Sequence, residues 1–175
     1  MRAAAASYPA WDEGLRRPVN LGSRINLCRQ RHQGQPPWGR EEDALLALET
    51  LVGLQSRGQP IAPPRDAGMD AARERGRALF TARMGQLDLS CAACHDDNWG
   101  RRLAGAPIPQ AHPVGYPIYR LEWQSLGSLQ RRLRNCMSGV RAEAYPYGAP
   151  ELVDLEAFLM ERAAGLAIET PAVRP

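Results

Sequence analysis

The chain has 175 residues, a formal net charge of +3 and an apolar fraction of 44%. This length and composition indicate a globular protein with one or two small domains. The charge is too small to indicate nucleic-acid binding, and no segment approaches the roughly 20 apolar residues that a transmembrane helix requires. Residues 1–6 lack the apolar stretch of a secretory signal, so we expect any such signal to be absent from this sequence.

The first part of the chain repeats a pattern that returns near its end. Residues 24–28 and 132–136 both read Arg-x-x-x-Cys, and residues 48–58 match residues 155–165 at almost the same offset. Two correspondences in the same order favour a duplicated domain. The Gly- and Pro-rich segment 58–68 is the expected boundary between the two copies.

Two helices are expected to form the core of the second copy. Over residues 70–83, Gly76 and Phe80 fall on one close-packed face with other small and apolar residues. Over residues 150–164, apolar residues recur at helical spacing. A proline at the start of this second helix and Gly165 after its end are typical helix boundaries.

Residues 91–95 read Cys-Ala-Ala-Cys-His, which is the attachment signature of a c-type haem. Cys91 and Cys94 would form thioethers with the porphyrin, and His95 would be the first axial ligand of the iron. A disulfide switch and a zinc site that also uses Cys136 are two other interpretations. No strand-rich segment flanks the motif, as a thioredoxin-like switch would require. Because adjacent residues such as Cys94 and His95 seldom converge on one tetrahedral ion, we favour haem.

The second axial ligand is expected from a helix over residues 124–137. At about 100° per residue, Cys136 points within about 20° of Leu129, on the apolar face of this helix. Arg132 lies one turn earlier and roughly 40° away. Its charge favours a thiolate, and its planar guanidinium suits an oxyanion such as sulfate or thiosulfate. Pairing of this arginine with a haem propionate is the alternative.

Methionine is the competing axial ligand, and it would make the protein a simple electron carrier. Met137 is next to Cys136, but its side chain departs by about 100° from the direction of the cysteine. Core packing is the better explanation for Met137, Met84 and Met160. The Gly- and Pro-rich segment 96–119 is expected to be a long irregular loop that covers the haem.

These features predict a mainly α fold with two cytochrome c-like domains, residues 1–64 and residues 65–175. The offset between the copies would place a first haem motif before Met1. We therefore expect the first domain to be degenerate, without its own C-x-x-C-H. One covalently bound haem c is expected, in the second domain.

Long runs of this chain resemble the SoxA subunit of the SoxAX cytochromes. These runs occur in the order of the family and together extend over essentially the whole chain. They are residues 24–32, 91–102, 119–124, 131–143 and 168–174.

The resemblance implies a periplasmic enzyme of sulfur oxidation, an L-cysteine S-thiosulfotransferase, that joins thiosulfate to a cysteine of the SoxYZ carrier protein. It also implies a heterodimer in which electrons pass through haem to the SoxX subunit. Cys136 would be an axial ligand carried as a persulfide intermediate, and Arg132 would bind the sulfur oxyanion. Cys28 matches the axial cysteine of the first haem in dihaem relatives.

Two other functions remain open on the sequence alone. One is simple electron transfer by a cytochrome c, which a methionine ligand would indicate. The other is a thiosulfate dehydrogenase that makes tetrathionate, which would need no carrier protein.

Overall fold

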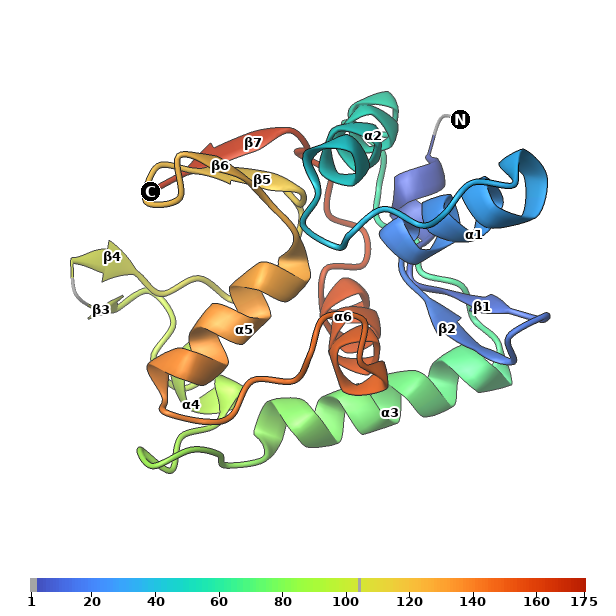
Figure 1. Ribbon diagram of the computed structural model, residues 1–175. Helices are drawn as coiled ribbons and strands as arrows, with labels where there is room; N and C mark the ends of the chain where they lie inside the picture. Colours follow the sequence, from blue (N-terminus) through green and yellow to red (C-terminus); the bar gives the residue numbers. More distant parts are fainter. Residues whose placement is uncertain (1–2, 104) are drawn as a thin grey trace.

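The computed structural model describes residues 3–103 and 105–175, so residues 1, 2 and 104 lie outside it. The described chain is mainly α-helical, which confirms the predicted fold class (Figure 1). Its elements in chain order are η1 (Ala4–Ser7), β1 (Ala10–Asp12), β2 (Arg17–Val19), α1 (Leu21–Gln33), α2 (Asp43–Gln55), α3 (Ala67–Thr81), α4 (Cys91–His95), β3 (Arg102–Leu103), β4 (Ala106–Pro107), β5 (Ile118–Arg120), β6 (Ser125–Gly127), α5 (Leu129–Gly139), α6 (Pro150–Arg162) and β7 (Ala172–Arg174). Within the described part, no helix combines the length and the apolar character needed to cross a membrane.

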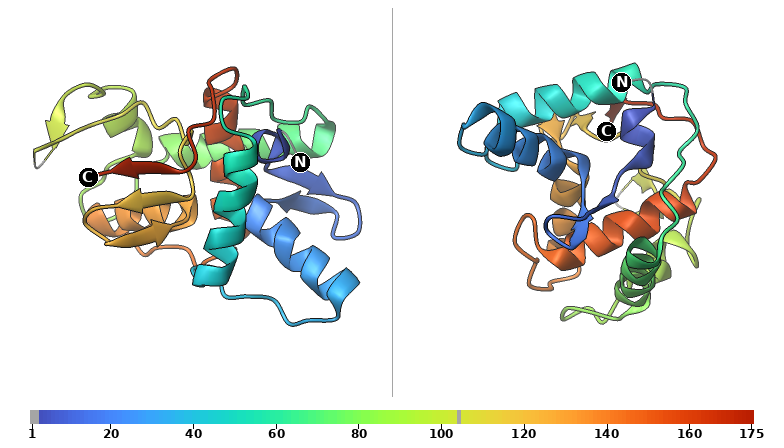
Figure 2. Two further views of the ribbon diagram at one scale, coloured as in Figure 1. Left: turned by 90° about the horizontal axis from the view of Figure 1, so that it is seen from above. Right: turned by 90° about the vertical axis from the view of Figure 1, so that its right-hand side faces the viewer.

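Helices α3 and α6 pack across each other and form the main core (Figures 1 and 2). They confirm the helices expected over residues 70–83 and 150–164. Gly76 permits their close approach, because a Cβ atom at this position would lie 2.0 Å from the backbone oxygen of Asp154. Four large side chains around this crossing are at most 6% exposed: Phe80, Leu152, Leu155 and Phe158.

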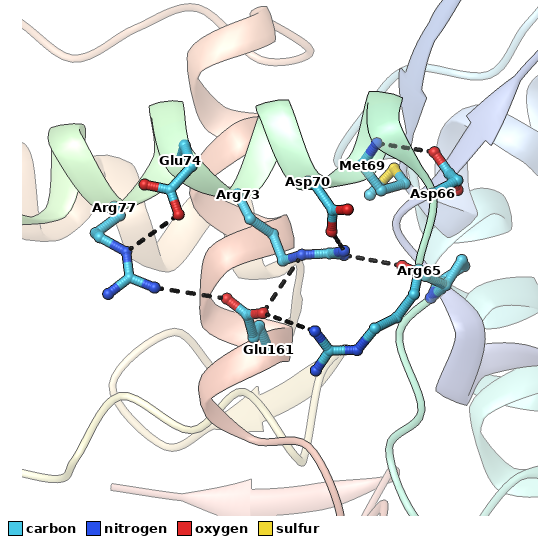
Figure 3. Close-up of polar contacts among 9 residues, drawn as sticks. Arg65, Asp66, Met69, Asp70, Arg73, Glu74, Arg77 and Glu161 are labelled. Atoms are coloured by element: carbon cyan, nitrogen blue, oxygen red, sulfur yellow. Dashed lines mark hydrogen bonds and ion pairs between the residues drawn. The ribbon is translucent and has the colours of Figure 1, made fainter.

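Charged side chains join α3 to the end of α6 (Figure 3). Arg73 is only 3% exposed, and its guanidinium donates to the carbonyl of Pro64 at 2.9 Å. Glu161 of α6 lies 3.5 Å from Nε of Arg73 and also reaches Arg65 at 3.7 Å and Arg77 at 3.9 Å. The buried positive charge of Arg73 is therefore compensated, as a buried charge in a stable fold must be.

Helix α5 begins later than the predicted helix over residues 124–137. Ser125–Gly127 forms strand β6, which pairs antiparallel with β5, and α5 begins only at Leu129. Ser128 ends the hairpin and caps the helix, because its hydroxyl accepts a hydrogen bond from the backbone N–H of Arg131 at 3.1 Å. The apolar residues of this stretch are thus divided between a strand and a helix, and a single helical period was the wrong interpretation.

The segment 96–119 is largely irregular, as expected, although it contains the β3–β4 hairpin and the start of β5. Its first part is mostly exposed. Its second part enters the interior, where Pro113, Gly115 and Pro117 are buried. The segment therefore covers part of the protein core as well as lying next to α4.

One set of elements occurs twice in the chain. The β1–β2 hairpin and α1 return as the β5–β6 hairpin and α5, with residue 10 corresponding to residue 118 at an offset of 108 positions. Helices α2 and α6 are related in the same way, at an offset of 107 positions from residue 43 to residue 150. This order of elements supports the inferred duplication.

The segments that follow α2 and α6 pair with each other. The N–H of Gly58 donates to the carbonyl of Ile168, and the N–H of Gly165 donates to the carbonyl of Ile61, each at 2.9 Å. Because the two glycines and the two isoleucines occupy equivalent positions in the two copies, this pair of hydrogen bonds is symmetric. The division into two domains near residue 64 stays a prediction.

Candidate functional site

The C-x-x-C-H motif forms the short helix α4. Ser90 begins this helix, and its hydroxyl accepts a backbone N–H of the first turn at 3.1 Å. Cys94 and His95 follow Cys91 by three and four positions, so each has its side chain on the same side of the helix as Cys91. All three are half-buried, and both thiols are free.

The imidazole of His95 is oriented by the long loop. Its Nδ1 lies 2.6 Å from the carbonyl oxygen of Pro109. A carbonyl oxygen can only accept, so Nδ1 carries the proton and Nε2 presents a lone pair, as in a metal-binding histidine. Burial lowers the pKa of His95, and the nearby charges of Arg132 and Arg162 act in the same direction, so the neutral form is favoured.

Aromatic and cationic groups surround the imidazole. The ring of Phe80 lies 6.4 Å from that of His95, and the guanidinium of Arg162 lies 4.9 Å from the centre of the Phe80 ring. Arg162 also donates to Asp96 at 2.6 Å and to the carbonyl of Gln110 at 3.2 Å. Arg162 therefore links the end of α6 to the segment that follows α4.

Cys136 and Arg132 lie on α5, as predicted, and they act electrostatically on the residues of α4. Burial raises the pKa of the Cys91 thiol to about 11, and the charge of Cys136 adds to this rise. Burial likewise raises the pKa of Cys136, although the charge of Arg132 opposes the rise. The arginine therefore favours the thiolate, as expected, but in the protein alone burial has the larger effect.

Sequence reasoning missed several residues around this site. Tyr116 is one of them: burial raises the pKa of its phenol to about 12, and the charges of Arg132 and Cys136 also act on it. Pro109 and Arg162 are two others. Only their positions in the folded chain connect these three residues to the motif, so no local pattern could have identified them.

The methionine alternative receives little support from the structure. Met137 is 3% exposed and packs in the core with Phe80, Leu152 and Leu155. Met84 packs against the same core from outside. Core packing therefore accounts for these two methionines, as the helical geometry predicted.

The zinc and disulfide alternatives are not supported either. In residues 3–103 and 105–175, no group of three or more His, Cys, Asp or Glu side chains is arranged to hold a metal ion. Cys28 is exposed on α1, away from α4 (Figures 1 and 2), and like the other cysteines it is free. The structure thus brings Cys136, but not Cys28, to the motif.

The residues present fit a c-type haem. They supply two free thiols and an imidazole with an available Nε2, and a further sulfur lies on a neighbouring helix. Nε of Arg162 is buried without a hydrogen-bond partner in the described protein, so it is available to an acidic group such as a haem propionate.

Comparison with known proteins places this site in a family context. The sequence matches the family described as SoxA/TsdA, cytochrome c domain, over residues 1–61 and 75–168. It is 34% identical to the L-cysteine S-thiosulfotransferase subunit SoxA of Pseudaminobacter salicylatoxidans, over 99% of this chain and 61% of that protein. The same subunit of Rhodovulum sulfidophilum is 33% identical over 97% of this chain and 59% of that protein.

A solved structure is also closely similar. The crystal structure of SoxXA from P. pantotrophus superposes with a TM-score of 0.95 and 30% sequence identity, over 100% of this chain and 66% of that chain. The corresponding curated subunit of Paracoccus pantotrophus is likewise 30% identical. The chain spans about 60% of the length of these curated relatives.

Proposed function

Because this chain belongs to the SoxA/TsdA cytochrome c family, we propose that it carries the sulfur chemistry of an L-cysteine S-thiosulfotransferase. The reaction joins thiosulfate to a cysteine thiol of the SoxYZ carrier. One S–S bond forms, and two electrons and one proton are released. The observation that carries the proposal is the similarity to L-cysteine S-thiosulfotransferase subunits over nearly the whole chain, which includes the C-x-x-C-H motif on α4 and Cys136 on α5.

We assign the haem-binding residues from the thiols and the imidazole that the site supplies. Cys91 and Cys94 would hold one haem c through thioethers, and Nε2 of His95 and the sulfur of Cys136 would coordinate its iron. When bound, the haem supplies an electron acceptor next to the sulfur nucleophile. The hydrogen bond from Nδ1 of His95 to Pro109 fixes the ring so that Nε2 is available for this role.

Cys136 and Arg132 are the proposed catalytic residues. The guanidinium of Arg132 holds the oxygens of thiosulfate through charge-assisted hydrogen bonds. Cys136 would carry an outer persulfide sulfur, which bonds to the terminal sulfur of thiosulfate as two electrons leave. The thiolate of the carrier then attacks that terminal sulfur, which forms the carrier S–S bond and releases the Cys136 persulfide. Burial of Cys136 and Tyr116 limits the access of water, which strengthens the attraction between the arginine and the anion.

The proposed electron-accepting partner is a SoxX cytochrome subunit. The similarity to the chain in the SoxXA structure supports a heterodimer of this kind. We further propose a periplasmic location, as the resemblance of the sequence implies. Residues 1–64, the first copy of the duplicated fold, contain no C-x-x-C-H motif.

The test is to replace Cys136 by serine in the haem-loaded protein. We expect conjugation of thiosulfate to the carrier to be lost while covalent haem attachment persists. Cys28→Ser is the matched control, and it should keep full activity. Retained activity in Cys136→Ser would remove this cysteine from the mechanism, and tetrathionate formation without a carrier would favour a thiosulfate dehydrogenase instead.

A further inference from the structure

The repeated hairpin and helix provide an internal comparison for the site. Strand β1 corresponds to β5, β2 to β6 and α1 to α5, at an offset of 108 positions. The turn residues Arg16 and Gln124 both have a φ of +51°. Asn20 and Ser128 both cap the helix that follows with their side chains. Equivalent positions in the two copies can therefore be compared residue by residue.

In the first copy, an acidic residue neutralises the arginine of the Arg-x-x-x-Cys pattern. Asp12, at the end of β1, is 2% exposed, and its carboxylate lies 2.8 Å from Nη1 of Arg24 and 3.3 Å from Arg31. The N–H of Leu15 also donates to this carboxylate at 2.8 Å. Hydrogen bonding from Arg31 and Leu15, together with both arginine charges, lowers the pKa of Asp12 to about 2. Arg24 is thus engaged by an internal anion.

In the second copy, the position of Asp12 is occupied by Arg120. Each residue is the last of its strand, and each is paired across the hairpin with the first residue of the next strand. No ion pair within the described residues involves Arg132, the equivalent of Arg24. The acidic partner of the first copy has therefore been replaced by a second cation, and Arg132 remains available to an external anion.

Because Asp12 lies beside Arg24, the equivalent Arg120 is expected to lie beside Arg132. The side chain of Arg120 is 14% exposed, it donates to Glu122 at 2.8 Å, and its guanidinium lies 5.2 Å from the ring of Trp123. Its Nε is buried and has no hydrogen-bond partner in the described protein. The positive charge of Arg120, like that of Arg132, opposes the rise in the pKa of Cys136 that burial causes. A buried donor without a partner in the described protein can bind a further acceptor, such as an oxygen of a bound anion.

We propose that Arg120 is a second anion-binding residue of the site and that, together with Arg132, it selects a doubly charged sulfur oxyanion such as thiosulfate. This inference rests on the proposed function. Glu122 is about half exposed, so water weakens its pairing with Arg120. The two guanidinium groups therefore offer a buried dianion more positive charge than Arg132 alone. The first copy, with Asp12 at the same position, would repel such an anion.

The experiment uses the haem-loaded protein and two substitutions, Arg120→Gln and Arg120→Asp. Thiosulfate KM and kcat are measured, and sulfate is used as an unreactive competitor at constant ionic strength. We expect Arg120→Gln to raise both the KM and the sulfate inhibition constant about tenfold or more, which is the loss of one charge-assisted hydrogen bond. The kcat should stay within about twofold and the haem spectrum should not change.

Arg120→Asp copies the arrangement of the first half and should have the larger effect. The new carboxylate is expected to pair with Arg132, as Asp12 pairs with Arg24, and to raise both constants about a hundredfold. Arg120→Lys keeps the charge and should recover most of the affinity. Arg17→Gln, which removes an exposed charge from β2, is the matched control and should change neither constant.

A structural role of Arg120 makes a different prediction. If this arginine served only to pair with Glu122, then Glu122→Gln would have the same effect as Arg120→Gln. The proposal predicts the opposite sign, a lower KM in Glu122→Gln, because a competing negative charge is removed. An unchanged KM and sulfate constant in both Arg120→Gln and Arg120→Asp would overturn the inference. If Arg132→Ala also left both constants unchanged, the proposed function itself would be wrong.

Discussion

Two carboxyl groups, the buried Glu156 and the half-buried Glu49, should make the stability of this protein fall as the pH rises. Glu49 on α2 and Glu156 on α6 occupy equivalent positions in the two copies, and both line a cavity of about 100 Å³. Burial raises the pKa of Glu49 from 4.5 to about 8, and the charges of Glu156 and Glu41 contribute while Arg40 opposes them. Burial raises the pKa of Glu156 from 4.5 to about 7, although the hydrogen bond from Asn20 at 3.1 Å and the charge of Arg40 counteract it.

The sign of the effect follows from proton binding. Between pH 4.5 and about 8, the folded protein keeps a proton on Glu49 that the unfolded chain releases. The free energy of unfolding must therefore decrease as the pH rises through this window, and the contribution is lost above the folded pKa. A shift of this size corresponds to about 5 kcal/mol as an upper bound. Since a domain is stable by only about 5–15 kcal/mol, such a loss is large.

Glu49→Gln tests this reasoning, because glutamine keeps the shape of the side chain and cannot ionise. Urea unfolding of the haem-loaded protein is measured from pH 5 to pH 8.5. We expect the wild-type midpoint to fall by roughly 1–2 M urea over this range. The variant should change much less and should be the more stable protein at high pH. Glu13→Gln, at an exposed position, should follow the wild type. Parallel curves for wild type and Glu49→Gln would refute the account.

Two further substitutions test the crossing of α3 and α6. Gly76→Ala should lower the free energy of unfolding by about 1–3 kcal/mol or more, because the added methyl group would overlap the backbone of Asp154. This cost exceeds the gain of about 1 kcal/mol that alanine brings in helix propensity. A variant that is more stable than the wild type in urea unfolding would contradict the close packing of α3 against α6. Glu161→Gln should cost about 1–3 kcal/mol, because it removes a carboxylate from the buried guanidinium of Arg73. Glu74→Gln, at an exposed position on α3, is its control in the same urea titration and should be nearly neutral.

The helices of the core could be predicted because their signals are local. Small and apolar residues at helical spacing identified α3 and α6, and a glycine at the crossing was among them. The start of α5 could not be predicted in this way. It depends on the pairing of β6 with β5, and a strand of three residues is too short to show a period of its own.

For the candidate site, too, only the features that lie close together in the sequence could be predicted. The motif on α4 and the relation of Arg132 to Cys136 follow from spacing along one helix. The partners of these residues do not: Pro109 reaches His95 from a loop, and Tyr116 lies next to Cys136 only after folding. Burial also reverses the effect expected from Arg132 alone, because the cost of desolvating a thiolate depends on the whole environment of the sulfur.

The most direct test of the central claim is the electronic spectrum of the ferric, haem-loaded protein, recorded by optical absorption and electron paramagnetic resonance. We predict the signature of a haem bound by histidine and thiolate, and we predict its loss in Cys136→Ser. A methionine–iron charge-transfer band, unchanged in that variant, would contradict the assignment of Cys136 and leave an electron carrier in place of an enzyme.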